Sequence, residues 1–160
     1  MVSGSDITQA NLANAVEETL TGYRSLNADE KLGLLWMVYT NMGSAVTPAA
    51  PGAADEQMTQ QLLGEIEKMD HDQQLQFMRD LVNRMDTPLT GRYGSFTKDN
   101  KLVFWYQLAE GMRTGSVVPV PEQYTLPTGA ATVLNQIVTL DFNEQITLLR
   151  HAVLEMGPVA

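Results

Sequence analysis

The sequence predicts an all-α fold, and three observations carry that prediction. Helix-start signals recur along the chain, each an acceptor side chain with an acid or an amide three residues later. Between these signals, apolar residues repeat at steps of three and four, as they do on one face of a helix. Apolar and polar residues nowhere alternate over the length of a strand, so a sheet is not expected.

The first helix with a clear start follows Asn27, which has Glu30 three residues later. Its apolar residues fall on a single stripe, and Gly43 follows them at a place where glycine commonly ends a helix. The stripe consists of Leu32, Leu35, Trp36, Tyr39 and Met42. We therefore expect this helix to bury a face that carries two aromatic rings.

The second half of the chain repeats this pattern. A helix expected from Lys101 ends before Gly115 and carries a second aromatic stripe. That stripe consists of Leu102, Trp105, Leu108 and Met112. Asp70 and Asp141 mark two further helix starts. Residues 117–121 contain two prolines, which cannot donate to a strand ladder, so this stretch is predicted to be an extended loop.

The chain also aligns with itself at a shift of about 70 residues. At this shift Asp29 meets Asp99, and the order of features is the same in both halves. An aromatic helix is followed by a Pro-rich loop, a helix, a capping acid and a final helix with a central arginine. We therefore predict one domain over residues 1–160, built from quasi-repeats at about 27–88 and 97–158 that pack their apolar faces together.

The charge balance excludes several classes of partner. The chain has 10 Lys and Arg against 19 Asp and Glu, a formal net charge of -9 at pH 7. It therefore lacks the cationic surface that would hold nucleic-acid phosphates or an anionic membrane. Cysteine is absent, which excludes disulfides, thiolate metal sites and cysteine nucleophiles.

Membrane and secretion signals are not found either. The first charge is Asp6, where a secretory leader would carry a basic residue, and no apolar leader segment accompanies it. The longest uncharged run, residues 32–54, is interrupted by prolines and glycines and cannot form one spanning helix. We expect a cytoplasmic protein without membrane insertion.

Residues suited to catalysis are scarce. The two imidazoles, His71 and His151, do not lie in a helical zinc pair. The glycine-rich nucleotide motifs and the serine-hydrolase elbow are absent. Acid pairs such as Glu17 with Glu18 fall at helix starts or on polar faces, where carboxylates favour water. We expect neither an enzyme nor a metal site.

Aromatic residues suggest a binding surface instead. Trp36, Tyr39, Trp105 and Tyr106 occupy the two aromatic helices, and in facing halves they would line a common interface. Such an interface suits a long, flat, apolar ligand, and a forty-carbon polyene of roughly 30 Å is about as long as a 20-residue helix. The alternative is a ligand-free acidic helical module that binds a basic partner, with the aromatic residues serving only as core.

Six segments in one order give the sequence a family resemblance. They are LLWMVYTNMG, TPAAPGAA, NRMDTP, KLVFWYQLAEGM, VPVPEQY and EQITLLRHAVLEMG. Over about Ala28 to Gly157 the chain resembles the carotenoid-binding N-terminal domain of the orange carotenoid proteins. It is most similar to the stand-alone helical members of that family, and a truncated N-terminal domain is the alternative. The resemblance implies two interleaved four-helix bundles.

The same resemblance implies a function and a site. The function is cyanobacterial photoprotection, by quenching singlet oxygen and, in some members, excited phycobilisomes. The cofactor would be one ketocarotenoid: canthaxanthin, echinenone or hydroxyechinenone. The implied contact residues are Leu32, Trp36, Tyr39, Met78, Leu102, Trp105, Tyr106, Val120, Pro121 and Tyr124.

Partners beyond the pigment are implied in the same way. They are the phycobilisome, or a separate carotenoid carrier related to the family's C-terminal domain, with a location at the phycobilisome or thylakoid. Arg150 matches the arginine that docks such partners, whereas on the residues alone it is a surface cation. Asp99 departs from the family's asparagine. The pigment-loaded protein is expected to be a monomer.

Overall fold

The computed structural model describes residues 4–42, 56–121 and 124–158, with the backbone alone for residues 4–13 and 56. Eight helices and no strand lie in these ranges, which confirms the all-α prediction. The helices are α1 (Gly4–Arg24), α2 (Ala28–Met42), α3 (Glu56–Glu67), α4 (His71–Val82), α5 (Pro88–Gly94), α6 (Lys98–Thr114), α7 (Thr128–Val138) and α8 (Phe142–Leu154).

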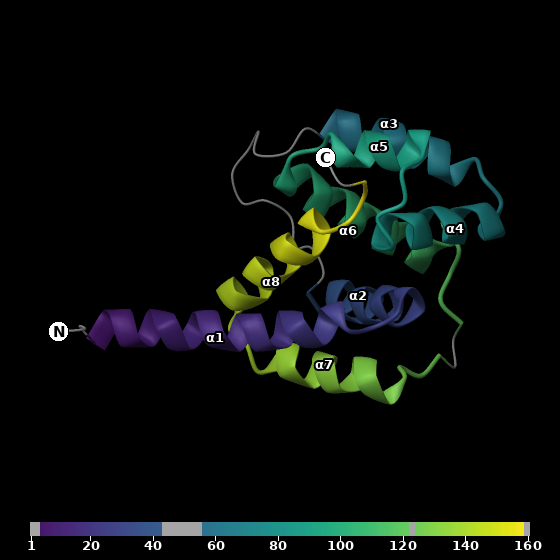
Figure 1. The fold of residues 1–160 in the computed structure, drawn as a ribbon. Helices are drawn as coiled ribbons and strands as arrows, with labels where there is room; N and C mark the ends of the chain where they lie inside the picture. The colour runs from purple at the N-terminus through teal and green to yellow at the C-terminus, as the bar shows by residue number, and fades with distance from the viewer. Residues whose placement is uncertain (1–3, 43–55, 122–123, 159–160) are drawn as a thin grey trace.

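These helices form two bundles of four (Figure 1). One bundle consists of α3, α4, α5 and α6, which are consecutive in the chain. The other consists of α1 and α2 from the start of the chain together with α7 and α8 from its end. The bundles meet along a seam, where α2 packs on α4 and α6, and α6 packs on α8. The two interleaved four-helix bundles of the family fold are thus present.

Side-chain caps confirm the predicted helix starts. The carboxylates of Asp70 and Asp141 accept hydrogen bonds from backbone N–H groups three residues later, both at 2.8 Å. The side chain of Asn27 does the same for α2 at 2.9 Å. Gly115 ends α6 with a φ of 94°, the left-handed conformation that favours glycine. The predicted end of α2 at Gly43 lies outside the described residues.

Two elements differ from the sequence prediction. The helix expected from Lys101 begins at Lys98, one turn earlier, because the Thr97 hydroxyl accepts a bond from a backbone N–H in its first turn. The short helix α5 was not predicted, although Thr87 caps it and Pro88 occupies its first turn. A helix of two turns is too short to show an apolar period, so only its capping residues could reveal it. Residues 117–121 form no helix or strand, as predicted.

The helix contacts are related by an internal two-fold. Exchanging α2, α3 and α4 for α6, α7 and α8 turns the α2–α4 contact into α6–α8, and the α2–α7 contact into α6–α3. Side chains at corresponding positions of the two repeats form corresponding hydrogen bonds. The amide of Gln74 donates to the carbonyl of Ile66 at 3.0 Å, and that of Gln145 donates to the carbonyl of Ile137 at 3.0 Å. The quasi-repeats are intertwined rather than stacked, since each contributes helices to both bundles.

A cation–ring contact recurs in the same way. The ammonium of Lys31 lies 5.3 Å from the ring centroid of Tyr23, and that of Lys101 lies 5.4 Å from the ring centroid of Tyr93. Burial lowers the pKa of both lysines. These paired contacts at positions one repeat apart support the predicted duplication.

Three of the five tyrosines should report alkaline unfolding. Burial raises the pKa of Tyr23, Tyr39 and Tyr93 above the ordinary value of 10.0. Above pH ~10 the unfolded chain loses phenolic protons that the folded chain keeps, so the free energy of unfolding should fall as the pH rises. Urea unfolding at pH ~9 and ~11, with tyrosinate absorbance followed in parallel, measures this.

Tyr39→Phe is the matched variant for this measurement, and it should weaken the alkaline dependence because one buried phenol is removed. If all five tyrosines ionised near pH ~10 while the protein stayed folded, the burial argument would be wrong.

Candidate functional site at the seam between the bundles

The elements that meet at the seam carry every residue that the family resemblance assigns to the pigment. Helix α2 supplies three of them, α4 one and α6 three, and the loop before α7 supplies the rest. Leu32, Tyr39, Met78, Leu102 and Trp105 are buried. Trp36, Tyr106 and Val120 are half-buried, and Pro121 and Tyr124 are exposed.

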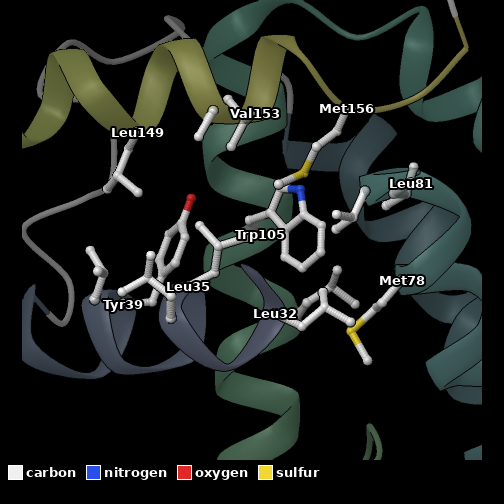
Figure 2. Packing of buried hydrophobic residues seen from close by; sticks show 14 of the residues in the cluster. Leu32, Leu35, Tyr39, Met78, Leu81, Trp105, Leu149, Val153 and Met156 are labelled. Atoms are coloured by element: carbon white, nitrogen blue, oxygen red, sulfur yellow. The ribbon is translucent and has the colours of Figure 1, made fainter. Parts of the chain in front are cut away.

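The centre of the seam is filled by the protein's own side chains. Figure 2 shows Leu35 and Tyr39 of α2 facing Leu149 of α8, with Trp105 of α6 beside them. Tyr39 and Trp105 are each only 2% exposed. The aromatic helices therefore share an interface, as predicted, but these rings lie in the core and do not line an open channel.

The polar atoms of three aromatic side chains at the seam are paired within the protein. The indole N–H of Trp105 donates to the Tyr93 hydroxyl at 3.1 Å, and that hydroxyl donates to the carbonyl of Val153 at 2.8 Å. The hydroxyl of Tyr39 donates to the carbonyl of Leu102 at 3.3 Å. Because these donors have acceptors, the rings offer apolar faces without leaving an unsatisfied polar atom.

At one end of the seam there is a cavity of about 270 Å³. It brings together five of the ten predicted contact residues, namely Leu32, Met78, Val120, Pro121 and Tyr124. The other lining residues are Asp29, Gly33, Leu75, Arg79, Met112, Val118 and Pro119. The predicted residues outside this cavity are Trp36, Tyr39, Leu102, Trp105 and Tyr106. A second cavity, of about 320 Å³ between α2, α7 and α8, includes none of the ten.

An ion pair forms the polar rim of the first cavity. Arg79 donates to both carboxylate oxygens of Asp29, with Nε at 2.8 Å and Nη2 at 3.2 Å. The hydrogen bond to Asp29 raises the pKa of Arg79. The side chain of Arg79 is 38% exposed and that of Asp29 is 64% exposed, so solvent screens the pair and it adds little stability. Because the guanidinium of Arg79 is bonded to both carboxylate oxygens of Asp29, this cation is not available to a ligand.

The loop that closes this cavity is anchored by a buried amide. Gln74, on α4, is 1% exposed. Its Nε2 donates to the carbonyl of Ser116 at 3.1 Å, and its Oε1 accepts from the backbone N–H of Val118 at 2.7 Å. Val117, between them, is fully buried. The loop is thus held against α4 and α6, which sets the position of residues 118–121 over the cavity.

Two glycines that shape this site were not among the predicted contact residues. A Cβ at Gly33 would lie 2.1 Å from the hydroxyl oxygen of Tyr124, so glycine lets that ring cover α2. A Cβ at Gly111 would lie 2.6 Å from Cγ2 of Val117. Glycine inside a helix lowers its stability relative to alanine, and its presence in both aromatic helices was the available signal of close packing.

Neither a metal site nor a membrane span is found in the described part of the chain. No three His, Asp or Glu side chains there are grouped to hold a metal ion, and no helix is long and apolar enough to cross a bilayer. His71 and His151 are both exposed, as expected for surface imidazoles.

Comparison with known proteins agrees with the fold. The family described as "Orange carotenoid protein, N-terminal" matches residues 9–158. An orange carotenoid-binding domain-containing protein of Nostoc sp. strain PCC 7120 is 44% identical over 144 residues, which cover 90% of this chain and 84% of that protein. The orange carotenoid-binding protein of Synechocystis sp. strain PCC 6803 is 46% identical, and the match covers 91% of this chain but 46% of that protein.

Solved structures give the same relationship. A red carotenoid protein of Anabaena (Nostoc) sp. PCC 7120 binding canthaxanthin superposes with a TM-score of 0.80 at 34% identity, covering 90% of this chain and 99% of that one. The orange carotenoid protein of the same organism binding canthaxanthin gives a TM-score of 0.83 at 39% identity, covering 92% of this chain and 48% of that one. This chain therefore belongs to the family of the orange carotenoid protein N-terminal domain.

Proposed function

We propose that this protein binds one ketocarotenoid along the seam and acts in photoprotection as a pigment-binding protein rather than an enzyme. The observation that carries the proposal is the cavity at the end of the seam, where five of the residues assigned by family resemblance converge. Two similar solved proteins bind canthaxanthin, and this supports a ketocarotenoid as the class of ligand. Canthaxanthin, echinenone or hydroxyechinenone each supply the same rod with at least one ring carbonyl.

The chemistry of the seam fits such a pigment. Leu32, Met78 and Met112 present aliphatic carbons and polarisable sulfurs to the cavity. The rings of Tyr39 and Trp105 continue this apolar surface toward α8, with their polar atoms already paired (Figure 2). The charged groups lining the cavity, Asp29 and Arg79, form an ion pair at its rim. A conjugated chain can therefore be buried against these residues without leaving their polar groups unpaired.

Size indicates that the cavity holds only part of the pigment. A polyene of roughly 30 Å, the length of a 20-residue helix, exceeds a space of about 270 Å³. The rest of the rod would follow the seam, where Leu35, Tyr39 and Trp105 now pack together (Figure 2). Binding therefore requires these side chains to move apart. Trp36, Leu102 and Tyr106 are the remaining contacts along this path.

The division of work between pigment and protein follows from these contacts. The conjugated chain supplies the low-lying triplet state that takes up the energy of singlet oxygen. The protein excludes water from the pigment, holds it extended and keeps it dispersed, and none of these roles needs a general base or a metal. Quenching of excited phycobilisomes, and exchange of pigment with a separate carotenoid carrier at the phycobilisome or thylakoid, belong to the same proposal.

Colour tests the proposal directly. The protein purified from cells that make canthaxanthin is expected to be orange or red, with about one pigment per chain and a monomeric mass. The loaded protein should shorten the lifetime of singlet oxygen more than the same chain from pigment-free cells. A colourless product would contradict the proposal and favour the other reading, an acidic interaction module whose seam is filled by its own side chains.

Phycobilisome quenching is measured separately, by adding the loaded protein to isolated phycobilisomes and recording their fluorescence. Unchanged fluorescence would remove the antenna as a partner and leave pigment binding intact.

A further inference from the structure

The two-fold of the fold places two arginines at matched positions with unequal partners. Arg79 on α4 is bonded to Asp29 through two nitrogens, at 2.8 and 3.2 Å. Arg150 on α8 stands one repeat later and faces Asp99, but its nearest carboxylate contact is 3.9 Å, from Nη2 to Oδ1. That separation is too long for a hydrogen bond. Arg79 therefore uses two of its N–H donors on Asp29, whereas the corresponding donors of Arg150 form no hydrogen bond with Asp99.

One of those donors is buried. The side chain of Arg150 is 44% exposed, yet its Nε has no access to solvent and no hydrogen-bond partner. The Nη end of the guanidinium thus faces water, and the Nε–H faces the protein. In the described part of the chain only one other side-chain polar atom, Oε1 of Gln107, is buried without a partner. Buried N–H groups are nearly always paired, so this donor calls for an acceptor.

The position of Arg150 indicates where that acceptor would come from. Its neighbour Leu149 points into the seam, as does Val153 one turn later (Figure 2). Arg79, its counterpart, lines the cavity at one end of the seam. The two-fold that exchanges α4 with α8 places Arg150 at the opposite end. A rod held along the seam would thus have the cavity around one ring and the Arg150 donor beside the other.

We propose that the Nε–H of Arg150 donates a hydrogen bond to a ring carbonyl oxygen of the bound ketocarotenoid. This inference rests on the proposed function and adds a basis for ligand choice. An arginine side chain has donors and no acceptor, so it matches a carbonyl and cannot match an unsubstituted ring. A carotene without carbonyls would leave the Nε–H unpaired. Arg150 therefore selects ketocarotenoids over carotenes, and it orients echinenone, whose one carbonyl points to α8.

A competition experiment tests this role. The pigment-free full chain is mixed with equal amounts of canthaxanthin and β-carotene, and the bound pigments are extracted and quantified. The wild-type protein should enrich canthaxanthin, and Arg150→Met should reduce that enrichment about tenfold because a hydrogen bond from a charged donor is lost. Arg113→Met is the matched control, since Arg113 is 63% exposed on α6 and pairs with Glu110. It should leave the ratio unchanged.

The carbonyl stretch of bound echinenone gives a second readout that does not depend on yield. In the wild-type protein this infrared band should lie below its position in an apolar solvent, because the oxygen accepts a hydrogen bond. Arg150→Met should return it toward the solvent position, and Arg150→Lys should restore part of the shift. The inference is overturned if the wild type binds both pigments equally, or if Arg150→Met alters neither the ratio nor the band. A wild type that binds neither pigment overturns the proposed function itself.

Discussion

Trp105→Ala is expected to lower the free energy of unfolding by about 3–5 kcal/mol and to abolish retention of the pigment. The indole is 2% exposed between the two bundles (Figure 2). Its removal leaves a void at the seam and takes away the donor that pairs with the Tyr93 hydroxyl at 3.1 Å. Urea unfolding of the pigment-free chain gives the stability, and absorbance after gel filtration gives the pigment retained.

Trp36→Ala separates the two effects. Trp36 is half-buried on α2 and packs against the core from its edge, so its loss should cost less stability than that of Trp105. It should still lower pigment occupancy or shift the visible spectrum, because both rings belong to the proposed contact surface. An unchanged spectrum of the loaded protein in both variants would show that these rings do not contact the pigment.

Gly111→Ala is expected to destabilise the protein by about 1–3 kcal/mol through overpacking and to displace the loop over the cavity. The added Cβ would lie 2.6 Å from Cγ2 of Val117, which is fully buried and branched and cannot swing away. Moving Val117 also strains the neighbouring bond from the Val118 N–H to Gln74 Oε1, now 2.7 Å long. Faster hydrogen exchange at Val118, together with weaker pigment binding, measures the displacement.

Gly91→Ala provides the same substitution without the contact. Gly91 lies in α5, and a Cβ there would meet no atom within 4 Å. Alanine is the better helix former, so this variant should gain up to about 1 kcal/mol. If Gly111→Ala were as stable as Gly91→Ala, the close approach of the loop to α6 would not constrain the fold.

Much of the fold could be predicted from local sequence, because helix starts and apolar stripes are local features. Asp70 and Asp141 cap their helices through bonds that span three residues, and such bonds depend on little else. The short helix α5 was not predicted, because a helix of two turns is too short to show a repeating pattern of apolar residues. How the quasi-repeats intertwine was given by the family resemblance alone, because helix periodicity does not say which helices share a bundle.

The candidate site was predictable to a lesser extent. The stripe residues of α2 and α6 do meet at the seam, and half of the assigned contacts surround one cavity. That Tyr39 and Trp105 fill the seam centre depends on side-chain volumes from three helices, which no single stripe contains. The role of Gln74 likewise depends on a loop 42 residues away, whose carbonyl its amide meets. Only the three-dimensional packing shows such contacts.

The unequal make-up of the two bundles has a consequence for biosynthesis. The bundle of α3 to α6 is one uninterrupted stretch of chain, so it can assemble as soon as α6 leaves the ribosome. Helix α1, in contrast, packs on α7 and α8, which are made after this bundle. Helix α1 therefore waits until α7 and α8 have been made, and closing that long loop is the entropically costly step. Folding should accordingly proceed from the middle outward, with the seam completed last.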